Sequence, residues 1–270
     1  MKATTTHPGL DPELAERLIE RLCELRLCGD ELSHSREANL AAIDKLLDNQ
    51  PFYTLGIHSV IRAVEAGKLT REGVLALVAD ITKCSKDIGH TKGPNYISPA
   101  ACLEGLIEGA TLMREVRDRR GTVIFGAGHS GSMINCYNRL AAYFQAHGCA
   151  VPTPAAGNEV QKDWYLDYVG RVAVVSDTCG IHHTHMTAAM AAMLDDLDAP
   201  PALAVCDHGF GGECINRHVP CVVPMDTNDP GFAVARHLGE DFVLVPLNDN
   251  RPNYVTVELA EIYITLIEAL

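Results

Sequence analysis

The first part of the chain carries the apolar spacing of amphipathic helices. Leu14, Leu18 and Leu22 recur at four-residue intervals, which places their side chains on one face of a helix. Asp11 followed by Pro12 is typical of an N-cap and a first helical position. The same patterns predict further helices over residues 35–47, 57–66, 70–81 and 99–119. We therefore predict a helical N-terminal segment over residues 1–118.

The pattern changes at residue 119, where short apolar runs begin to alternate with helical stretches. These runs are residues 122–125, 150–153, 171–175, 202–206, 221–224 and 242–246. They lack polar alternation, which favours strands covered on both faces, and the intervening helices favour a parallel sheet. The last residues, VELAEIYITLIEAL, predict an apolar helix that covers the sheet or contacts a partner subunit. The sequence thus predicts an α/β fold, with a Rossmann-like parallel sheet over residues 119–270 that carries the active site.

Composition narrows the classes of partner. The chain is 47% hydrophobic and 21% charged, which is typical of a globular protein, and its formal net charge is −13. This charge argues against nucleic acid or an anionic membrane as the main partner, but a small anionic metabolite can bind where helix N-termini or a metal reverse the local potential. No apolar run has membrane length, no secretion signal begins the chain, and the ten cysteines form no C-x-x-C motif. We expect a cytoplasmic protein with free thiols.

Polar and titratable side chains follow most of the predicted strands. The segments that come after the first, third, fourth, fifth and last runs are GAGHSGS, SDTCGIHHTH, DHGFGG, DTNDP and NDN. Ligands of open parallel sheets bind beyond the carboxyl ends of the strands. We therefore expect His129, His183, Asp207 and Asn228 to line one cleft.

The segment GAGHSGS combines a tight strand-to-helix turn with hydroxyl groups. Glycines there let the backbone approach a ligand, and the N-terminus of the next helix offers free N–H groups to an anion. Ser130, Gly131 and Ser132 are therefore predicted to bind phosphate, and Asn228 and Asp229 to bind other parts of the substrate. The G-x-G-x-x-G spacing is present, but the acidic residue expected about 20 positions later in a dinucleotide fold is not, which argues against NAD.

The run HHTH suggests a metal site. In an extended segment His183 and His185 point to the same side, and with Asp207 or His208 they would form a site for a divalent zinc, manganese or iron ion. The H-E-x-x-H pattern is absent, so a helix cap with ordinary hydrogen-bonded histidines is the alternative. His129 or Asp177 would then serve as a general acid or base.

Several of these segments match a known family. They are Gly128-His129 with Gly131, Thr153 to Gly157, His183 to His185, Asp207 to Gly209, Asn228 to Pro230 and Val245 to Leu247, with Asn39-Leu40 as a weaker match. On these residues the chain resembles a family of bacterial, largely actinobacterial, proteins labelled phosphatase. The glycine-rich strand end also resembles, more loosely, the sugar isomerase (SIS) domain. The family's proline after the first histidine is replaced here by Ser130.

The resemblance implies a hydrolase that acts on a phosphate ester of a small metabolite. A metal held by the histidines would polarise the phosphoryl group and lower the pKa of the attacking water. Two alternatives stay open: a sugar-phosphate isomerase that transfers protons through histidine, and a phosphosugar-binding regulator without catalysis. We also expect a homodimer or a higher homo-oligomer.

Overall fold

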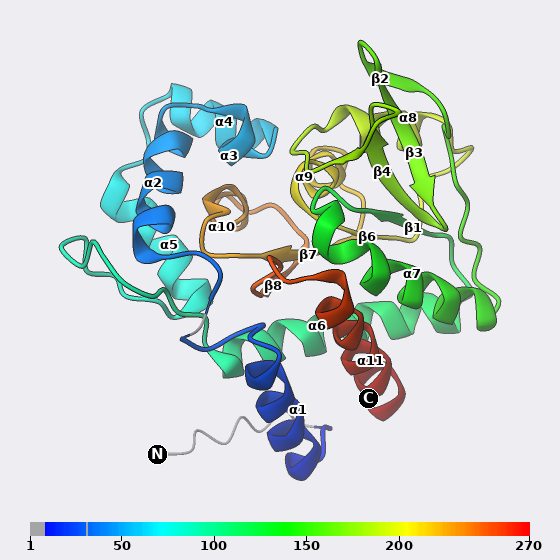
Figure 1. Ribbon diagram of the computed structural model, residues 1–270, viewed down its shortest axis with the longest axis horizontal. Coiled ribbons are helices and arrows are strands. Elements are labelled where there is room, and N and C mark those ends of the chain that lie inside the picture. The colour runs from blue at the N-terminus through cyan, green and yellow to red at the C-terminus, as the bar shows by residue number, and fades with distance from the viewer. Residues whose placement is uncertain (1–8, 31) are drawn as a thin grey trace.

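The computed structural model describes residues 9–30 and 32–270, which form eleven helices and eight strands (Figure 1). The helices are α1 Pro12–Glu24, α2 Arg36–Leu47, α3 Pro51–Thr54, α4 His58–Glu65, α5 Arg71–Thr82, α6 Pro99–Asp118, α7 Ser130–Ala146, α8 Ala188–Asp195, α9 His208–Asn216, α10 Pro230–His237 and α11 Asn253–Ala269. The strands are β1 Val123–Gly126, β2 Glu159–Gln161, β3 Trp164–Val169, β4 Val172–Ser176, β5 Ile181–His182, β6 Leu203–Cys206, β7 Cys221–Met225 and β8 Val243–Pro246.

The helices predicted before residue 119 are confirmed as α1, α2, α4, α5 and α6, with the short α3 as an addition. Asp11 caps α1 as expected, because its carboxylate accepts a hydrogen bond from the Glu13 N–H at 2.8 Å. Ser35 and Ser98 cap α2 and α6 in the same way. The apolar C-terminal helix is also confirmed, as α11. The N-terminal helical segment is therefore present.

The sheet is mixed α/β with a parallel centre, as predicted. Its order is β2-β3-β4-β1-β6-β7-β8, and β5 pairs with β4. The strands β4, β1, β6, β7 and β8 run parallel. If these five strands are numbered by their order along the chain, they lie side by side in the sheet in the order 2-1-3-4-5. In a sheet of this order the crevice for a ligand opens at the carboxyl ends of the first and third strands, which are β1 and β6.

The prediction of a strand at residues 150–153 is wrong. Only Ala150 forms a bridge, to Thr122, because Pro152 and Pro154 have no N–H to donate to a ladder. The strands β2 and β3 form instead an antiparallel hairpin, and β3 pairs antiparallel with β4. The short β5 also lies in a segment that was expected to be a loop. The parallel sheet thus carries an antiparallel extension beside β4.

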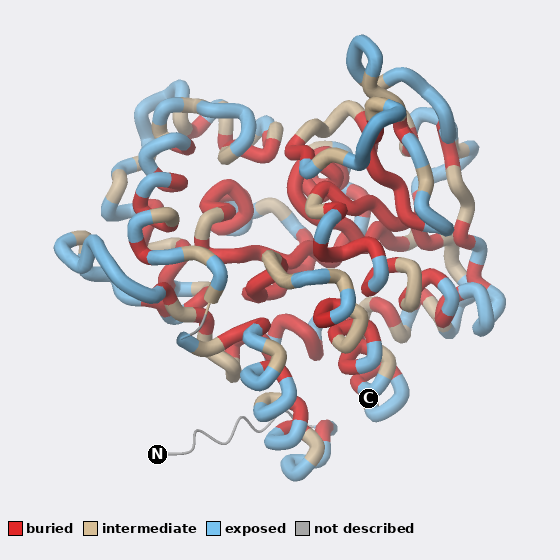
Figure 2. The backbone as a smooth tube through the Cα atoms, viewed as in Figure 1, coloured by how far each residue is buried: buried red, intermediate tan, exposed pale blue. Residues whose placement is uncertain are grey.

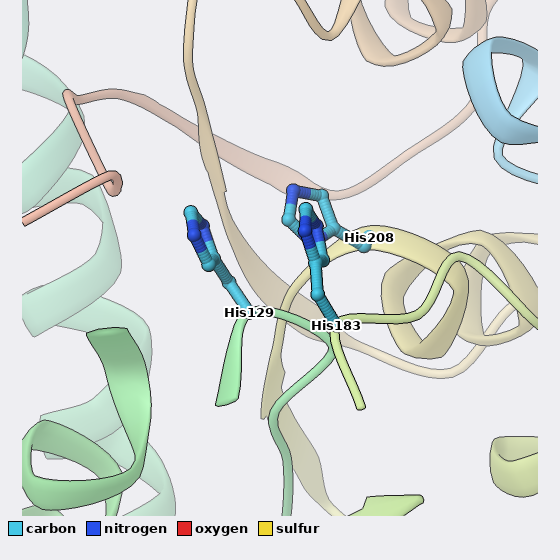
Figure 3. Close-up of side chains that lie close together, drawn as sticks. All are labelled: His129, His183 and His208. Carbon is cyan, nitrogen blue, oxygen red and sulfur yellow. The ribbon is translucent and has the colours of Figure 1, made fainter. Parts of the chain in front are cut away.

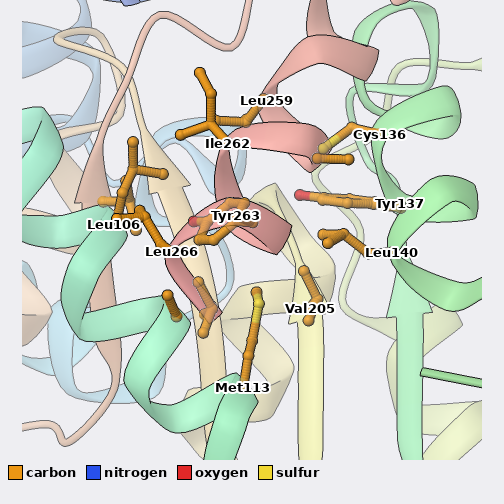
Figure 4. Packing of buried hydrophobic residues seen from close by; sticks show 14 of the residues in the cluster. Leu106, Met113, Cys136, Tyr137, Leu140, Val205, Leu259, Ile262, Tyr263 and Leu266 are labelled. Atoms are coloured by element: carbon orange, nitrogen blue, oxygen red, sulfur yellow. The ribbon is translucent and has the colours of Figure 1, made fainter. Parts of the chain in front are cut away.

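Side chains of the parallel strands alternate between two hydrophobic layers. In β1, Val123 and Phe125 join the layer with α1, α6, α7 and α11, whereas Ile124 joins the layer with α2, α4, α5, α8, α9 and α10. Figure 4 shows side chains of α6, α7 and α11 packed together over β6. The buried backbone in the middle of Figure 2 is the sheet between these layers. The N-terminal helices contribute to both layers, and a domain boundary at residue 118 stays a prediction.

Two negative findings concern the described residues. None of their helices is long and apolar enough to cross a bilayer. All ten cysteines fall within them and are free thiols, of which Cys23 and Cys179 are exposed and the others buried.

Candidate active site

A cavity of about 290 Å³ lies at the carboxyl ends of the parallel strands. It is lined by His34, Phe52, Tyr53, His129, His183, His185, His208, Asn228, Asp229, Asp249 and Asn250. The loops after β1, β6, β7 and β8 all contribute, as does the segment after β5. His129, His183 and Asn228 therefore line one cavity, as the strand-end pattern predicts, whereas Asp207, predicted to line it with them, does not.

Glycines let the histidine-bearing segments approach closely. The Thr184 N–H donates to the Gly128 carbonyl at 2.9 Å, and a Cβ at Gly128 would lie 2.6 Å from the Thr184 carbonyl oxygen. A Cβ at Gly209 would lie only 2.2 Å from the His185 carbonyl oxygen. His208 itself has a φ of 45°, a left-handed conformation that is costly for a residue with a side chain. These close backbone contacts bring the histidine-bearing segments together.

His129, His183 and His208 form one wall of the cavity, which we call the imidazole wall (Figure 3). The rings of His129 and His183 are stacked, with centroids 4.6 Å apart and planes 7° apart. Each of the three residues offers a ring nitrogen that lies within 4.8 Å of the others. They come from three different segments, after β1, after β5 and at the start of α9, so the sheet edge alone assembles them.

His185 extends this wall and is fixed by the N-terminal helices. Its Nδ1 lies 2.5 Å from the Phe52 carbonyl oxygen, to which it can only donate, so Nε2 keeps its lone pair. That Nε2 lies 3.1 Å from Nε2 of His183. The Phe52 ring stacks on the His185 ring with centroids 3.4 Å apart. A backbone carbonyl that fixes the tautomer in this way is the usual support for a metal-binding histidine.

Asp229 and Asp249 form the opposite, acidic wall. Nε2 of His208 lies 3.9 Å from Asp229 Oδ1 and 3.7 Å from Asp249 Oδ2. These three residues form a second group with ligand atoms within 4.8 Å of one another, and all three are buried. Nδ1 of His129 lies 3.6 Å from Asp249 Oδ2. His208 thus belongs to both walls.

Asp207 is fully buried, and both oxygens of its carboxylate already accept hydrogen bonds from the main chain. Oδ1 accepts a hydrogen bond from the Gly128 N–H at 2.6 Å, and Oδ2 accepts one from the His129 N–H at 3.0 Å. Burial and the charge of Asp249 raise its pKa to about 7, against the opposing effect of His129 and the two N–H groups. The carboxylate therefore holds the loop after β1 rather than facing the cavity.

His34 and Asp226 form a pair at the edge of the cavity. Nδ1 of His34 lies 2.8 Å from Asp226 Oδ2, and Nε2 lies 3.3 Å from the Asn250 amide nitrogen. The hydrogen bond to Asp226 raises the pKa of His34, although burial opposes it. A histidine oriented by a buried carboxylate is suited to proton transfer.

The protonation states of the imidazoles differ sharply. Burial lowers the pKa of His183 to about 4 and that of His185 to about 3, and it holds the pKa of His208 well below its ordinary value. Burial also acts to lower the pKa of His129, but the nearby carboxylates, Asp249 first, raise it to about 9. At neutral pH three rings therefore carry free lone pairs, which is the form that binds metals.

The residues fit a divalent cation. Four buried polar atoms around the cavity lack a hydrogen-bond partner: His129 Nδ1, His208 Nδ1, Asn228 Oδ1 and Asp249 Oδ2. Buried polar atoms are nearly always paired, so a cluster of unpaired ones indicates a missing partner. Neutral imidazole nitrogens and carboxylate oxygens are the ligands of zinc, manganese and iron.

Other predicted site residues lie outside this cavity. The Ser130 hydroxyl donates to the His182 carbonyl at 3.2 Å, and the Ser132 hydroxyl donates to the Asp249 carbonyl, so both serines already have protein partners. Gly131 is exposed at the first turn of α7. Asp177 accepts hydrogen bonds from the N–H groups of Cys179 and Gly180 at 3.0 and 2.9 Å. None of these residues lines the cavity, and their predicted roles stay predictions.

Five cavity residues were given no role from the sequence: His34, Phe52, Tyr53, Asp249 and Asn250. His34, Phe52 and Tyr53 come from the helical segment, where no strand end marks them. The only sequence signal nearby is Asn39, whose amide donates to the Thr227 carbonyl and so ties α2 to the loop after β7. Asp249 and Asn250 lie in the segment NDN after the last strand, where the strand-end pattern marked polar residues without giving them a role.

The fold and the cavity define an α/β protein whose histidines and carboxylates converge at the switch point of a parallel sheet. The family model described as Phosphatase matches residues 13–264, and the chain belongs to this family. A curated relative, Phosphatase SCO2771 of Streptomyces coelicolor, is 30% identical over 247 residues, which are 90% of this chain and 91% of that protein. No solved structure gives a significant match.

Proposed function

We propose that the protein is a phosphomonoesterase that hydrolyses a phosphate ester of a small metabolite with the help of a divalent metal ion. The observation that carries this proposal is the set of buried nitrogen and oxygen atoms without hydrogen-bond partners around the cavity, in a chain from the Phosphatase family. Hydrolysis transfers the phosphoryl group to water: the ester P–O bond breaks, and the leaving oxygen takes up a proton. The chain must therefore hold phosphate charge and supply a proton.

The proposed ligands are the two groups that share His208. His129 and His183 complete one group, and Asp229 and Asp249 complete the other. His185 supports His183 from behind, and Asp207 fixes the loop that carries His129. A bound divalent ion would neutralise phosphoryl charge and acidify a water molecule. Of the four ligands predicted from sequence, this assignment keeps His183 and His208, and it gives His185 and Asp207 positioning roles in place of direct coordination.

The proposed general acid is His34. Its ring lines the cavity, it is 26% exposed, and its partner Asp226 favours the protonated form. A protonated imidazole there can give its proton to the leaving oxygen and recover it from solvent. Asn228, whose amide oxygen has no partner, is placed to orient a hydroxyl of the substrate. His129 as the acid, which the sequence predicts, is the alternative assignment.

The test is elemental analysis of the purified protein together with phosphate release from a panel of sugar and polyol phosphates. We expect bound zinc, manganese or iron, loss of phosphate release after chelation, and recovery when one of these ions is returned. Isomerisation of a sugar phosphate without phosphate release would favour the isomerase alternative. Full phosphate release by the metal-free protein would contradict the metal assignment.

A matched pair of variants sharpens this test. His183→Ala removes a proposed ligand, whereas His182→Ala removes the neighbouring ring, which does not line the cavity. Only the first should lower the metal content. Small anionic metabolites, a cytoplasmic location and a homo-oligomer belong to the same proposal, and light scattering of the purified protein tests the last of these.

A further inference from the structure

A second pocket adjoins the cavity on the far side of His183 and His185. Its volume is about 460 Å³, and Phe52, His183 and His185 line both spaces. The two hollows are therefore neighbours across two imidazole rings. A molecule bound with its phosphate at the imidazole wall can therefore place its remaining part in this pocket.

The second pocket differs in chemistry from the first. Its side chains include Phe52, Trp164 and Met186, whereas no aspartate, glutamate, lysine or arginine lines it. Phe52 is 42% exposed although it is a large apolar side chain, so part of its surface is free for a ligand. Aromatic rings and a methionine sulfur favour contacts with planar apolar groups. The pocket therefore suits an uncharged ring.

Trp164 is held in place from behind. Its ring stacks on that of His182, with centroids 4.1 Å apart and planes 5° apart. His182 Nε2 in turn lies 3.0 Å from Asp177 Oδ2. The β2–β3 hairpin, which extends the parallel sheet, thus delivers a fixed aromatic side chain to the pocket, together with Gln161 as a polar group.

We propose that the substrate is a phosphate monoester whose alcohol carries an uncharged planar ring, with the ring bound against Trp164 and Phe52. This inference rests on the proposed function, because it assumes that the phosphate occupies the histidine cavity. Stacking on these rings would hold the leaving group, and the shared His183 and His185 would set the distance between ring and phosphate. Substrate selection would then depend on a hairpin that contributes nothing to the metal ligands.

The test compares esters with and without a ring, on the metal-loaded full chain. Adenosine 5′-monophosphate and ribose 5-phosphate differ only in the base, and phenyl phosphate carries its ring directly on the ester. We expect kcat/KM for at least one ring-bearing ester to exceed that for ribose 5-phosphate by about tenfold or more, mainly through KM. The result for the two ring-bearing esters tells whether a spacer separates ring and phosphate. Equal values for all three would overturn the proposal.

Variants of the hairpin give the matched control. Trp164→Ala should reduce the ratio of ring-bearing to ring-free kcat/KM by about tenfold, and Trp164→Phe should keep most of it. Tyr165, the next residue of β3, does not line the pocket, so Tyr165→Ala should leave the ratio unchanged. An unchanged ratio in Trp164→Ala would overturn the proposal.

A binding measurement separates this inference from the proposed function. Trp164 is the only tryptophan in the chain, so intrinsic tryptophan fluorescence reports on this pocket alone. Adenosine 5′-monophosphate or phenyl phosphate should quench it, and ribose 5-phosphate should not. Quenching without release of phosphate from any ester would mean that the hydrolase proposal fails while the ring site stands. Fluorescence unaffected by all three compounds would overturn the ring site itself.

Discussion

The imidazole wall and the acidic wall of the cavity differ in the partners of their buried polar groups. On the acidic wall the protein supplies some partners, as when Asp229 accepts a hydrogen bond from the Asp226 N–H at 3.2 Å. On the imidazole wall ring faces ring: His129 stacks on His183, and His185 stacks on His208 with centroids 4.1 Å apart. Two ring nitrogens of this wall, His129 Nδ1 and His208 Nδ1, have no hydrogen-bond partner, and an imidazole nitrogen can bind a cation once it is deprotonated. The imidazole wall therefore has two unpaired ring nitrogens, whereas the acidic wall has one unpaired carboxylate oxygen, Asp249 Oδ2.

His208 belongs to both walls, so its loss should have the largest effect. His208→Ala removes a ligand atom from both candidate metal groups and takes the imidazole away from the buried carboxylates of Asp229 and Asp249. We expect metal content to fall below about a tenth of the wild-type value and kcat/KM to fall by about a thousandfold. Elemental analysis and phosphate release measure the two effects. Wild-type metal content in this variant would contradict the shared-ligand assignment.

The acidic wall alone is tested by Asp249→Asn, which keeps the shape of the side chain but removes its charge. Asp249 belongs to only one of the two groups, so we expect weaker metal binding and a loss of about a hundredfold in kcat/KM. The variant should also lower the pKa of His129, because Asp249 is the first of the carboxylates that raise it. Titration of the His129 ring by NMR measures that shift. An unchanged pKa would mean that the two side chains do not interact.

The pH dependence of metal binding tells whether His129 is a ligand or an acid. With a pKa of about 9, the ring is protonated at neutral pH and must lose its proton before it can bind a cation. Affinity should therefore rise as pH increases, by about tenfold per unit, and level off near pH 9. Calorimetry in buffers of different ionisation enthalpy counts the protons released. His129→Gln should release about one proton fewer, and an unchanged count would favour its role as an acid.

Asp207→Asn tests the support beneath the imidazole wall. Both carboxylate oxygens accept main-chain hydrogen bonds, and an amide can replace only one of these acceptors. We expect a loss of about 1–3 kcal/mol in the free energy of unfolding and about tenfold weaker metal binding. Chemical denaturation of the metal-free protein measures the first quantity. If the Asp207→Asn variant keeps its full stability but loses bound metal, Asp207 is a direct ligand, as the sequence predicts.

The parallel strands could be predicted because they are buried on both faces and therefore read as continuous apolar runs, as Val172–Ser176 does. The hairpin could not be found in this way. Trp164–Val169 has only one buried position, Leu166, and contains the exposed Asp167, so its apolar signal is weak. The prediction of a strand at residues 150–153 failed although the run is apolar, because Pro152 and the following Pro154 cannot donate a hydrogen bond to a sheet.

The candidate site was predictable where the sheet alone builds it. His129 and His208 lie in the loop after β1 and at the start of α9 after β6, and parallel topology brings these strand ends together. His183 lies in the segment after β4, whose carboxyl end is at the same edge of the sheet. His34 was not predictable, because its contact with Asp226 spans 192 positions and depends on how the N-terminal helices dock. The same holds for Phe52, which reaches His185 across 133 positions. The sequence therefore predicts the imidazole wall, which the sheet positions, but not the residues that the N-terminal helical segment contributes.

The smallest expected effect concerns Asp177, which lies outside both walls. The sequence predicts it as a general acid or base, and in that case Asp177→Asn would lower kcat by about a hundredfold or more. Its side chain instead holds the loop after β4 through two N–H groups and lies beside His182, so we expect less than about a threefold change in kcat for a ring-free ester. A somewhat larger rise in KM for ring-bearing esters should accompany it, because His182 supports Trp164. Steady-state kinetics with ribose 5-phosphate and adenosine 5′-monophosphate separate these outcomes. A large loss of kcat for both esters would return Asp177 to the chemical step.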